Sequence, residues 1–157
     1  MPGQKVYLKM AIDEAFQAIR FNEGGPFGAV IERDGKLIGK GHNTVLKNHD
    51  PTAHAEINAI RDACRNLKKH HLTGAVLYSN FEPCPMCLSA IYWADIREVY
   101  FCAGKEVAEE IGFMDNHLYR ELKLPAEKKE VKVNFIAMDE MNELLKTWNR
   151  TDGKILY

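Results

Sequence analysis

The chain has 157 residues and a mass of 17.9 kDa, a length typical of one domain that buries its own core. Hydrophobic residues make up 46% of the chain and charged residues 27%, which excludes an intrinsically disordered protein. The net charge of −1 argues against a broadly basic, nucleic-acid-binding surface. No apolar run is long enough to span a membrane and the N-terminus has no signal-peptide core, so we expect a cytoplasmic protein.

Hydrophobic periodicity and turn residues predict helices that alternate with strands. In chain order the predicted elements are a helix over 8–19, strands over 27–31 and 36–41, a helix from 50 to 67, a strand over 75–78, a helix over 85–94, a strand over 98–102, two short helices within 105–124, a strand over 132–138 and a helix over 138–148. This order predicts a single α/β domain over residues 1–157, a three-layer α/β/α sandwich with a central mixed five-stranded sheet.

The last residues form a separate feature of the sequence. The tail over 149–157 is polar and then ends in Ile155-Leu156-Tyr157. A frayed terminus is the simple interpretation of such a tail. Its apolar end indicates instead that the tail docks on another surface.

Two short motifs carry most of the chemical information. His54-Ala55-Glu56 is followed by Pro83-Cys84-Pro85-Met86-Cys87, which is the pattern of zinc-dependent nucleobase deaminases. Cys84 and Cys87 lie at a predicted helix start, where the helix dipole favours the thiolates that bind zinc. With the imidazole of His54 they supply three ligands, and a catalytic zinc site leaves the fourth position to a water molecule or hydroxide.

Glu56 is the candidate proton shuttle of this site. It follows the ligand His54 by two residues and so lies near the metal without binding it. A carboxylate there can take a proton from the zinc-bound water and return it to a ring nitrogen and to the departing amine. A partly dehydrated pocket is expected to raise the pKa of Glu56 toward a useful value.

A structural zinc site in a non-enzymatic binding module is the alternative interpretation. Such a site needs a fourth protein ligand, for which the sequence offers four candidates. They are His70, His71, Cys102 and Cys64. Cys64 and Cys102 follow apolar patterns that predict packed side chains, and the two histidines follow Lys68-Lys69 in a predicted solvated turn.

The chain resembles the cytidine and nucleobase deaminase superfamily over nearly its whole length. The resemblance is closest to the bacterial guanine deaminase family, although several of the shared stretches also occur in bacterial tRNA adenosine deaminases. The stretches that carry it are Gly24-Gly25-Pro26-Phe27-Gly28-Ala29-Val30, Gly41-His42-Asn43, the segment from Asp50 to Glu56, and Glu82-Pro83-Cys84-Pro85-Met86-Cys87. The resemblance implies a cytidine deaminase-like fold, one zinc ion for each chain and deamination of guanine to xanthine and ammonia.

The resemblance also implies a set of residues around the base. Phe27 and Trp93 would supply aromatic contacts, and Asn43 would hydrogen-bond the base. Asp115 would accept from ring N–H groups and act as a possible second proton acceptor, while the backbone at Ala55 would lie near the reacting amine. In a homodimer implied by the same resemblance, the C-terminal segment would cross to the neighbour and Tyr157 would close its site. As plainer alternatives, Phe27 and Trp93 are core residues, Asn43 belongs to a turn and Asp115 caps a helix.

Two enzymatic alternatives remain open at this point. A tRNA adenosine deaminase would use the same zinc and glutamate, but binding RNA calls for a basic surface facing phosphates. Glu106, Glu109 and Glu110 lie shortly before the candidate pocket residue Asp115 and oppose such binding, so the sequence favours a small purine base. A deaminase of cytosine or another heterocycle is the second alternative, since the sequence does not give the size of the pocket.

Overall fold

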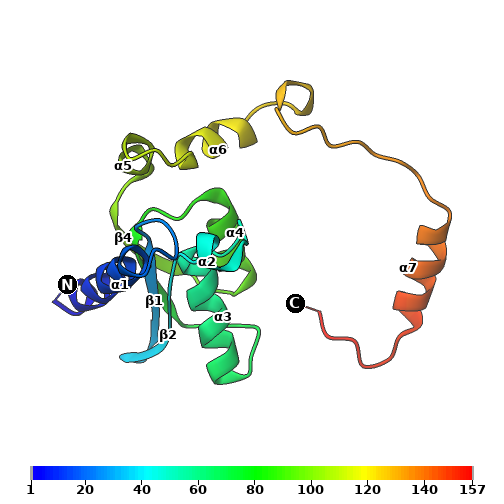
Figure 1. Ribbon diagram of the computed structural model, residues 1–157. Helices are drawn as coiled ribbons and strands as arrows, with labels where there is room; N and C mark the ends of the chain where they lie inside the picture. Colours follow the sequence, from blue (N-terminus) through cyan, green and yellow to red (C-terminus); the bar gives the residue numbers. More distant parts are fainter. Residues whose placement is uncertain (1, 157) are drawn as a thin grey trace.

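The computed structural model describes residues 2–156 and shows an α/β domain followed by an extended C-terminal arm (Figure 1). The strands are β1 (Gly28–Arg33), β2 (Lys36–His42), β3 (Val76–Phe81) and β4 (Glu98–Ala103). The helices are α1 (Pro2–Arg20), α2 (Val45–Asn48), α3 (Ala55–Leu67), α4 (Pro85–Trp93), α5 (Lys105–Glu110), α6 (Asp115–Leu122), the short 3-10 helix η1 (Ala126–Lys128) and α7 (Glu140–Arg150). None of the helices in this range is both long and apolar enough to cross a membrane.

The sheet is mixed and has the strand order β2-β1-β3-β4. β1 runs antiparallel to both β2 and β3, whereas β3 and β4 are parallel. Asp34 and Gly35, both with positive φ, form the turn between β1 and β2, as the sequence predicts. The α/β class and the mixed sheet are therefore confirmed.

Helices cover both faces of the sheet. Successive residues of a strand point to opposite faces, and the strands bury side chains on both. Ala29, Ile31 and Leu77 belong to the core formed with α3 and α4. The intervening residue Tyr78 points to the other face, where its ring stacks on Tyr7 of α1 with a centroid distance of 5.0 Å. The domain is thus built as three layers, with the sheet between α1 and the pair α3 and α4.

A seam of small residues brings α3 very close to β2. A Cβ atom added at Gly39 would lie 2.6 Å from the carbonyl oxygen of Ala59, and one at Gly41 would lie 2.8 Å from that of Ala55. Both contacts are shorter than a carbon atom tolerates, so glycine is required on the strand side. The seam fixes the distance between the helix and the sheet.

The predicted start of the helix at Asp50 is wrong. The Asp50 carboxylate accepts hydrogen bonds from the backbone and the hydroxyl of Thr52, at 2.8 and 2.7 Å, and so closes a turn. The helix α3 begins only at Ala55, with His54 at its N-cap. The same loop contains α2, a single helical turn that the sequence does not predict.

The predicted fifth strand over 132–138 is also wrong, since the sheet has four strands. This segment is extended, but it lies on the arm and pairs with no strand of the described chain (Figure 1). Its apolar side chains stand in solvent, with Phe135 91% exposed. Alternating hydrophobic residues predict an extended backbone here, but a strand also needs a neighbouring strand to pair with.

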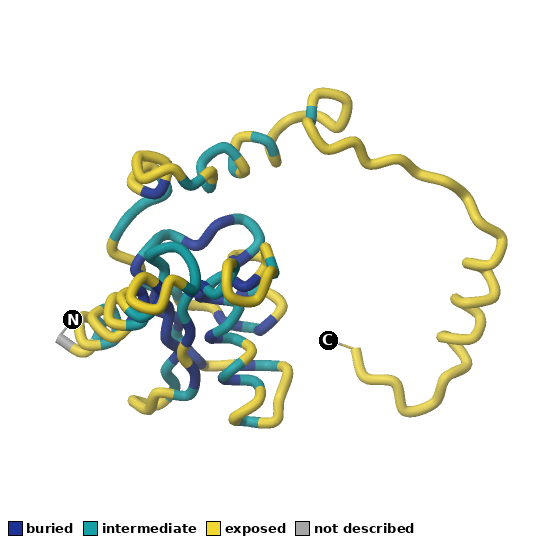
Figure 2. The backbone as a smooth tube through the Cα atoms, in the orientation of Figure 1, coloured by how far each residue is buried: buried dark blue, intermediate teal, exposed yellow. Residues whose placement is uncertain are grey.

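The arm is exposed throughout residues 130–156 (Figure 2). Its helix α7 has the predicted amphipathic pattern, yet the apolar face is not covered. Met141, Leu144, Leu145 and Trp148 are all between 44% and 58% exposed. Soluble proteins rarely leave an apolar stripe of this kind open to water.

Candidate active site and metal centre

Three metal-ligating side chains meet where two helices begin. His54 is the N-cap of α3, Cys84 is the N-cap of α4 and Cys87 lies in the first turn of α4. The Nδ1 atom of His54 lies 3.6 Å from the sulfur of Cys84 and 3.5 Å from that of Cys87. Pro85 occupies the first turn of α4, where its missing N–H costs no hydrogen bond.

The geometry of these atoms fits zinc. All three ligand atoms lie within 4.8 Å of one another. Tetrahedral zinc, with its usual Zn–N and Zn–S bonds, separates a nitrogen and a sulfur ligand by roughly 3.6 Å. Within residues 2–156, no further His, Cys, Asp or Glu atom completes this group to four, which disfavours a closed structural zinc site.

The charges at the site suit a cation. A hydrogen bond from Cys87 and a second from His54 lower the pKa of the Cys84 thiol to about 4, against the opposing effect of burial. The pKa of Cys87 is raised, first because it donates to Cys84 and then because it is buried beside Glu56. The pKa of His54 is raised mainly by its hydrogen bond with Cys84. The surroundings of Cys84 thus favour the thiolate form, which is the form that binds zinc.

Glu56 is buried beside the ligands, in the first turn of α3. Its side chain is 5% exposed, and Oε2 lies 3.4 Å from the sulfur of Cys87. Burial raises the pKa of Glu56 to about 7. A carboxyl group with this pKa is suited both to accept and to return a proton near neutral pH.

A cavity of about 230 Å³ opens onto Glu56 and onto two of the candidate metal ligands, His54 and Cys84. It brings together six of the residues that the sequence singles out, from five separate stretches of the chain. The lining residues are Phe27, Asn43, Val45, Pro51, His54, Glu56, Glu82, Cys84, Phe113 and Asp115. A small planar ligand in this cavity would contact the metal ligands, the buried carboxyl group and two aromatic rings.

Phe113 is a cavity residue that the sequence does not single out. Its ring packs edge-to-face against Phe27, with centroids 4.6 Å apart and planes at 87°. Phe27 makes a second edge contact with Phe81 at 5.0 Å. The one local signal for Phe113 is the preceding Gly112, whose φ of +95° is a backbone conformation that favours glycine and changes the direction of the chain.

Asn43 and Asp115 are two of the polar side chains that line the cavity. Asn43 is buried, and its Oδ1 accepts the backbone N–H of Val45 at 3.1 Å. No described residue accepts a hydrogen bond from Nδ2 of Asn43, so this group is available to a ligand. Asp115 is the first residue of α6 with Met114 at the N-cap, so its interpretation as the helix cap is wrong. Burial and the nearby Cys84 raise the pKa of Asp115.

Three of the predicted site residues that the structure describes, Cys87, Trp93 and Ala55, do not line this cavity. Trp93 is 65% exposed and lines a separate apolar groove with Ile57 and Ile60. Ala55 is completely buried in the core beneath the site. Tyr157 lies outside the described residues.

The chain belongs to the cytidine and deoxycytidylate deaminase family, because residues 1–103 match the family model of its zinc-binding region. The matched region contains all three metal-ligating residues and Glu56.

Particular relatives match far beyond that region. The chain is 40% identical to guanine deaminase of Bacillus subtilis over 155 residues, 99% of each chain. It matches the crystal structure of that enzyme with a TM-score of 0.92 over 98% of both chains. It is also 38% identical to the tRNA-specific adenosine deaminase of Aquifex aeolicus, over 91% of each chain. A structure solved in complex with 8-azaguanine is 31% identical, with a TM-score of 0.68 over 71% of this chain and 65% of the other.

Proposed function

We propose that the protein catalyses the hydrolytic deamination of guanine at C2, which gives xanthine and ammonia. The observation that carries this proposal is the buried Glu56, placed between a three-ligand metal site and a cavity for a planar base. The likeness to a guanine deaminase over 99% of the chain supports guanine as the base. We expect the protein to act in the cytoplasm.

His54, Cys84 and Cys87 would hold the zinc ion. When bound, zinc supplies Lewis-acid activation of a water molecule at the position that the protein leaves free. The carboxylate of Glu56 accepts a proton from the attacking water. It delivers this proton to ring nitrogen N3, then takes the second proton from the new C2 hydroxyl and passes it to the departing amine. The C2–N bond breaks as C2 keeps the oxygen as a carbonyl, so one water is consumed for each ammonia released.

The other cavity residues would bind and orient the purine. Phe27 and Phe113 offer aromatic surface to the ring. Nδ2 of Asn43 donates a hydrogen bond to the O6 carbonyl, and Asp115 accepts from ring N–H groups and serves as a second proton acceptor. The backbone at Ala55 lies behind the reacting amine.

A second copy of the chain would complete the site. The arm leaves the apolar face of α7 and the extended segment 131–136 in solvent, and the strand β4 has no neighbour on its outer side. In a homodimer with exchanged arms, the partner would cover the apolar face of α7, the segment 131–136 and the open edge of β4. Residues 149–157 would then reach the neighbouring cavity, where Tyr157 and Trp93 would contact the base.

The choice between a free base and tRNA can be made by a substrate panel. Zinc-loaded protein would be incubated with guanine, adenine, cytosine, their nucleosides and an anticodon stem-loop, and ammonia release would be measured. We expect ammonia from guanine at the highest rate. Release from the stem-loop alone would assign the protein to tRNA editing, as the Aquifex relative suggests.

A further inference from the structure

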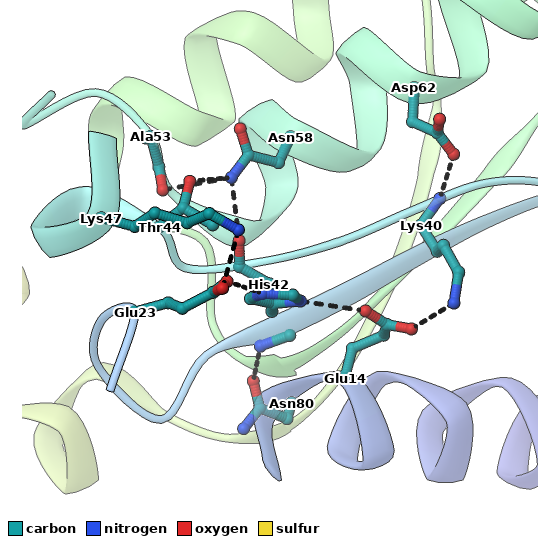
Figure 3. A network of polar contacts seen from close by, with 11 residues as sticks. Glu14, Glu23, Lys40, His42, Thr44, Lys47, Ala53, Asn58, Asp62 and Asn80 are labelled. Atoms are coloured by element: carbon teal, nitrogen blue, oxygen red, sulfur yellow. Dashed lines mark hydrogen bonds and ion pairs between the residues drawn. The ribbon is translucent and has the colours of Figure 1, made fainter. Parts of the chain in front are cut away.

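Two asparagines outside the cavity hold the chain on either side of two cavity residues. Asn80, on β3, is hydrogen-bonded to the neighbours of Phe27 in the chain, and Asn58, on α3, to the neighbours of Asn43 (Figure 3). Neither asparagine lines the cavity. Their side chains nevertheless determine where the backbone of the cavity wall runs.

Asn80 spans the residue pair that flanks Phe27. Its Oδ1 accepts the backbone N–H of Gly28 at 2.9 Å, and its Nδ2 donates to the carbonyl oxygen of Pro26 at 2.8 Å. One partner is a donor and the other an acceptor, so the orientation of the amide is fixed. The side chain is 9% exposed, so water cannot replace these bonds at low cost.

Asn58 has the same relation to Asn43. Its Nδ2 donates to the carbonyl oxygen of His42 at 2.8 Å and to the hydroxyl of Thr44 at 2.9 Å. The Ala53 carbonyl oxygen lies 3.3 Å from the same nitrogen, directly before the ligand His54. Asn58 therefore connects the chain around Asn43 with the chain that enters the metal site.

The two supports are themselves joined. The backbone N–H of Asn43 donates to the carbonyl oxygen of Phe27 at 3.0 Å. The backbone at Gly24 also packs closely on Asn43, since a Cβ added at Gly24 would lie 2.0 Å from Oδ1 of Asn43. The backbone around Phe27 and Asn43 is thus held by two carboxamide side chains and by a hydrogen bond between the two residues.

We propose that Asn58 and Asn80 are positioning residues of the base pocket, which act through Asn43 and Phe27 respectively. The proposal deepens the proposed function and rests on it for the identity of the base. It predicts that replacing either asparagine weakens binding of the base and does not impair the proton transfers by Glu56.

The test compares N58L and N80L with N66L in the zinc-loaded protein. Leucine has nearly the shape of asparagine but forms no hydrogen bonds. Asn66 is a matched control, because it lies on the same helix as Asn58 and its Nδ2 donates to the Ile38 carbonyl oxygen at 3.0 Å, away from the cavity. For N58L and N80L we expect KM for guanine to rise about tenfold with kcat within about threefold, and N66L to match the wild type.

Double-mutant cycles separate positioning from general destabilisation. N80L is expected to have little further effect on kcat/KM once Phe27 is replaced by alanine, and N58L little effect in N43A. Full additivity in both cycles would overturn the proposal. Zinc content and the thermal unfolding midpoint show whether the variants fold. If the leucine variants do not fold, N58S and N80S replace them in the test, because serine keeps a polar group that is too short to reach both partners.

A measurement without substrate makes the two proposals separable. Hydrogen exchange of the amides at residues 24–30 is expected to accelerate in N80L, and that at residues 42–46 in N58L, with N66L unchanged. Unchanged exchange in both variants would overturn the positioning role whatever base the enzyme uses. If the wild type is inactive on guanine but the two variants show these exchange effects, guanine is refuted as the substrate and the positioning role is not.

Discussion

At the scale of single residues, the proposed chemistry depends on a carboxyl group that is buried next to the candidate metal site. Glu56 lies 3.4 Å from a thiol ligand, and burial raises its pKa to about 7. The helix N-terminus that carries Glu56 would ordinarily favour a charged carboxylate. Burial outweighs that preference here, and the group can exchange a proton near neutral pH.

Replacing Glu56 by glutamine tests this role. E56Q keeps the size of the side chain but cannot take up a proton, so we expect guanine turnover to fall about 100- to 10,000-fold. Zinc content and the unfolding midpoint should stay close to those of the wild type. The exposed Glu127, replaced by glutamine, is the control. Turnover above one-tenth of the wild-type rate in E56Q would contradict the assignment.

The metal ligands and Glu56 can be predicted from the sequence because two short motifs contain all of them. Phe113 cannot be predicted in this way, since only the tertiary fold brings it 4.6 Å from Phe27. Trp93 shows the converse. It follows Cys87 by six residues, which places it roughly 240° around α4 and so turns it away from the ligands within one chain.

At the scale of elements, α1 is tied to β2 by charged groups. Glu14 accepts hydrogen bonds from Lys40 at 2.8 Å and from His42 at 3.2 Å, and His42 also contacts Glu23 at 2.7 Å (Figure 3). Burial tends to raise the pKa of Glu14, but the hydrogen bonds to Lys40 and His42 together lower it below 4.5. The folded state therefore holds the carboxylate in its charged form.

This tie predicts a pH dependence of stability. Because the pKa of Glu14 is lowered in the folded state, its contribution is present above pH 4.5 and is lost as the pH falls through the folded value. E14Q is expected to lower the free energy of unfolding by about 1 kcal/mol near neutral pH, and by less at an acidic pH below 4.5. Urea unfolding across this range measures both. An equal loss at both pH values would show that the carboxylate charge is not the cause.

Most elements follow from local pattern, and the exceptions have local physical reasons. The strands β1 and β2 and the helix α4 carry their own periodicity and turn residues. The start of α3 is displaced because the Asp50 side chain bonds its own turn instead of a helix N-terminus. The segment 132–138 has the pattern of a strand, but the described part of the chain provides no neighbour for it.

At the scale of the whole molecule, the exposed arm predicts association of two chains. The apolar face of α7 would be covered in a dimer, so L145Q is expected to weaken dimerisation, whereas K146Q on the polar face should not. Light scattering after size-exclusion chromatography gives the mass directly. A wild-type protein that remains monomeric at micromolar concentration would refute the exchange of arms.

The seam of glycine and alanine between β2 and α3 has a consequence for how the enzyme can change over evolution. Backbone meets backbone there, so α3 has no side-chain layer to absorb an added methyl group. His54 and Glu56 sit at the start of that helix. A mutation that adds volume near Gly39 would therefore tilt the helix and misplace the metal ligand and the proton carrier together. Substitutions in the loops that line the cavity can change substrate preference. The positions of His54 and Glu56 can change only if β2 moves together with α3.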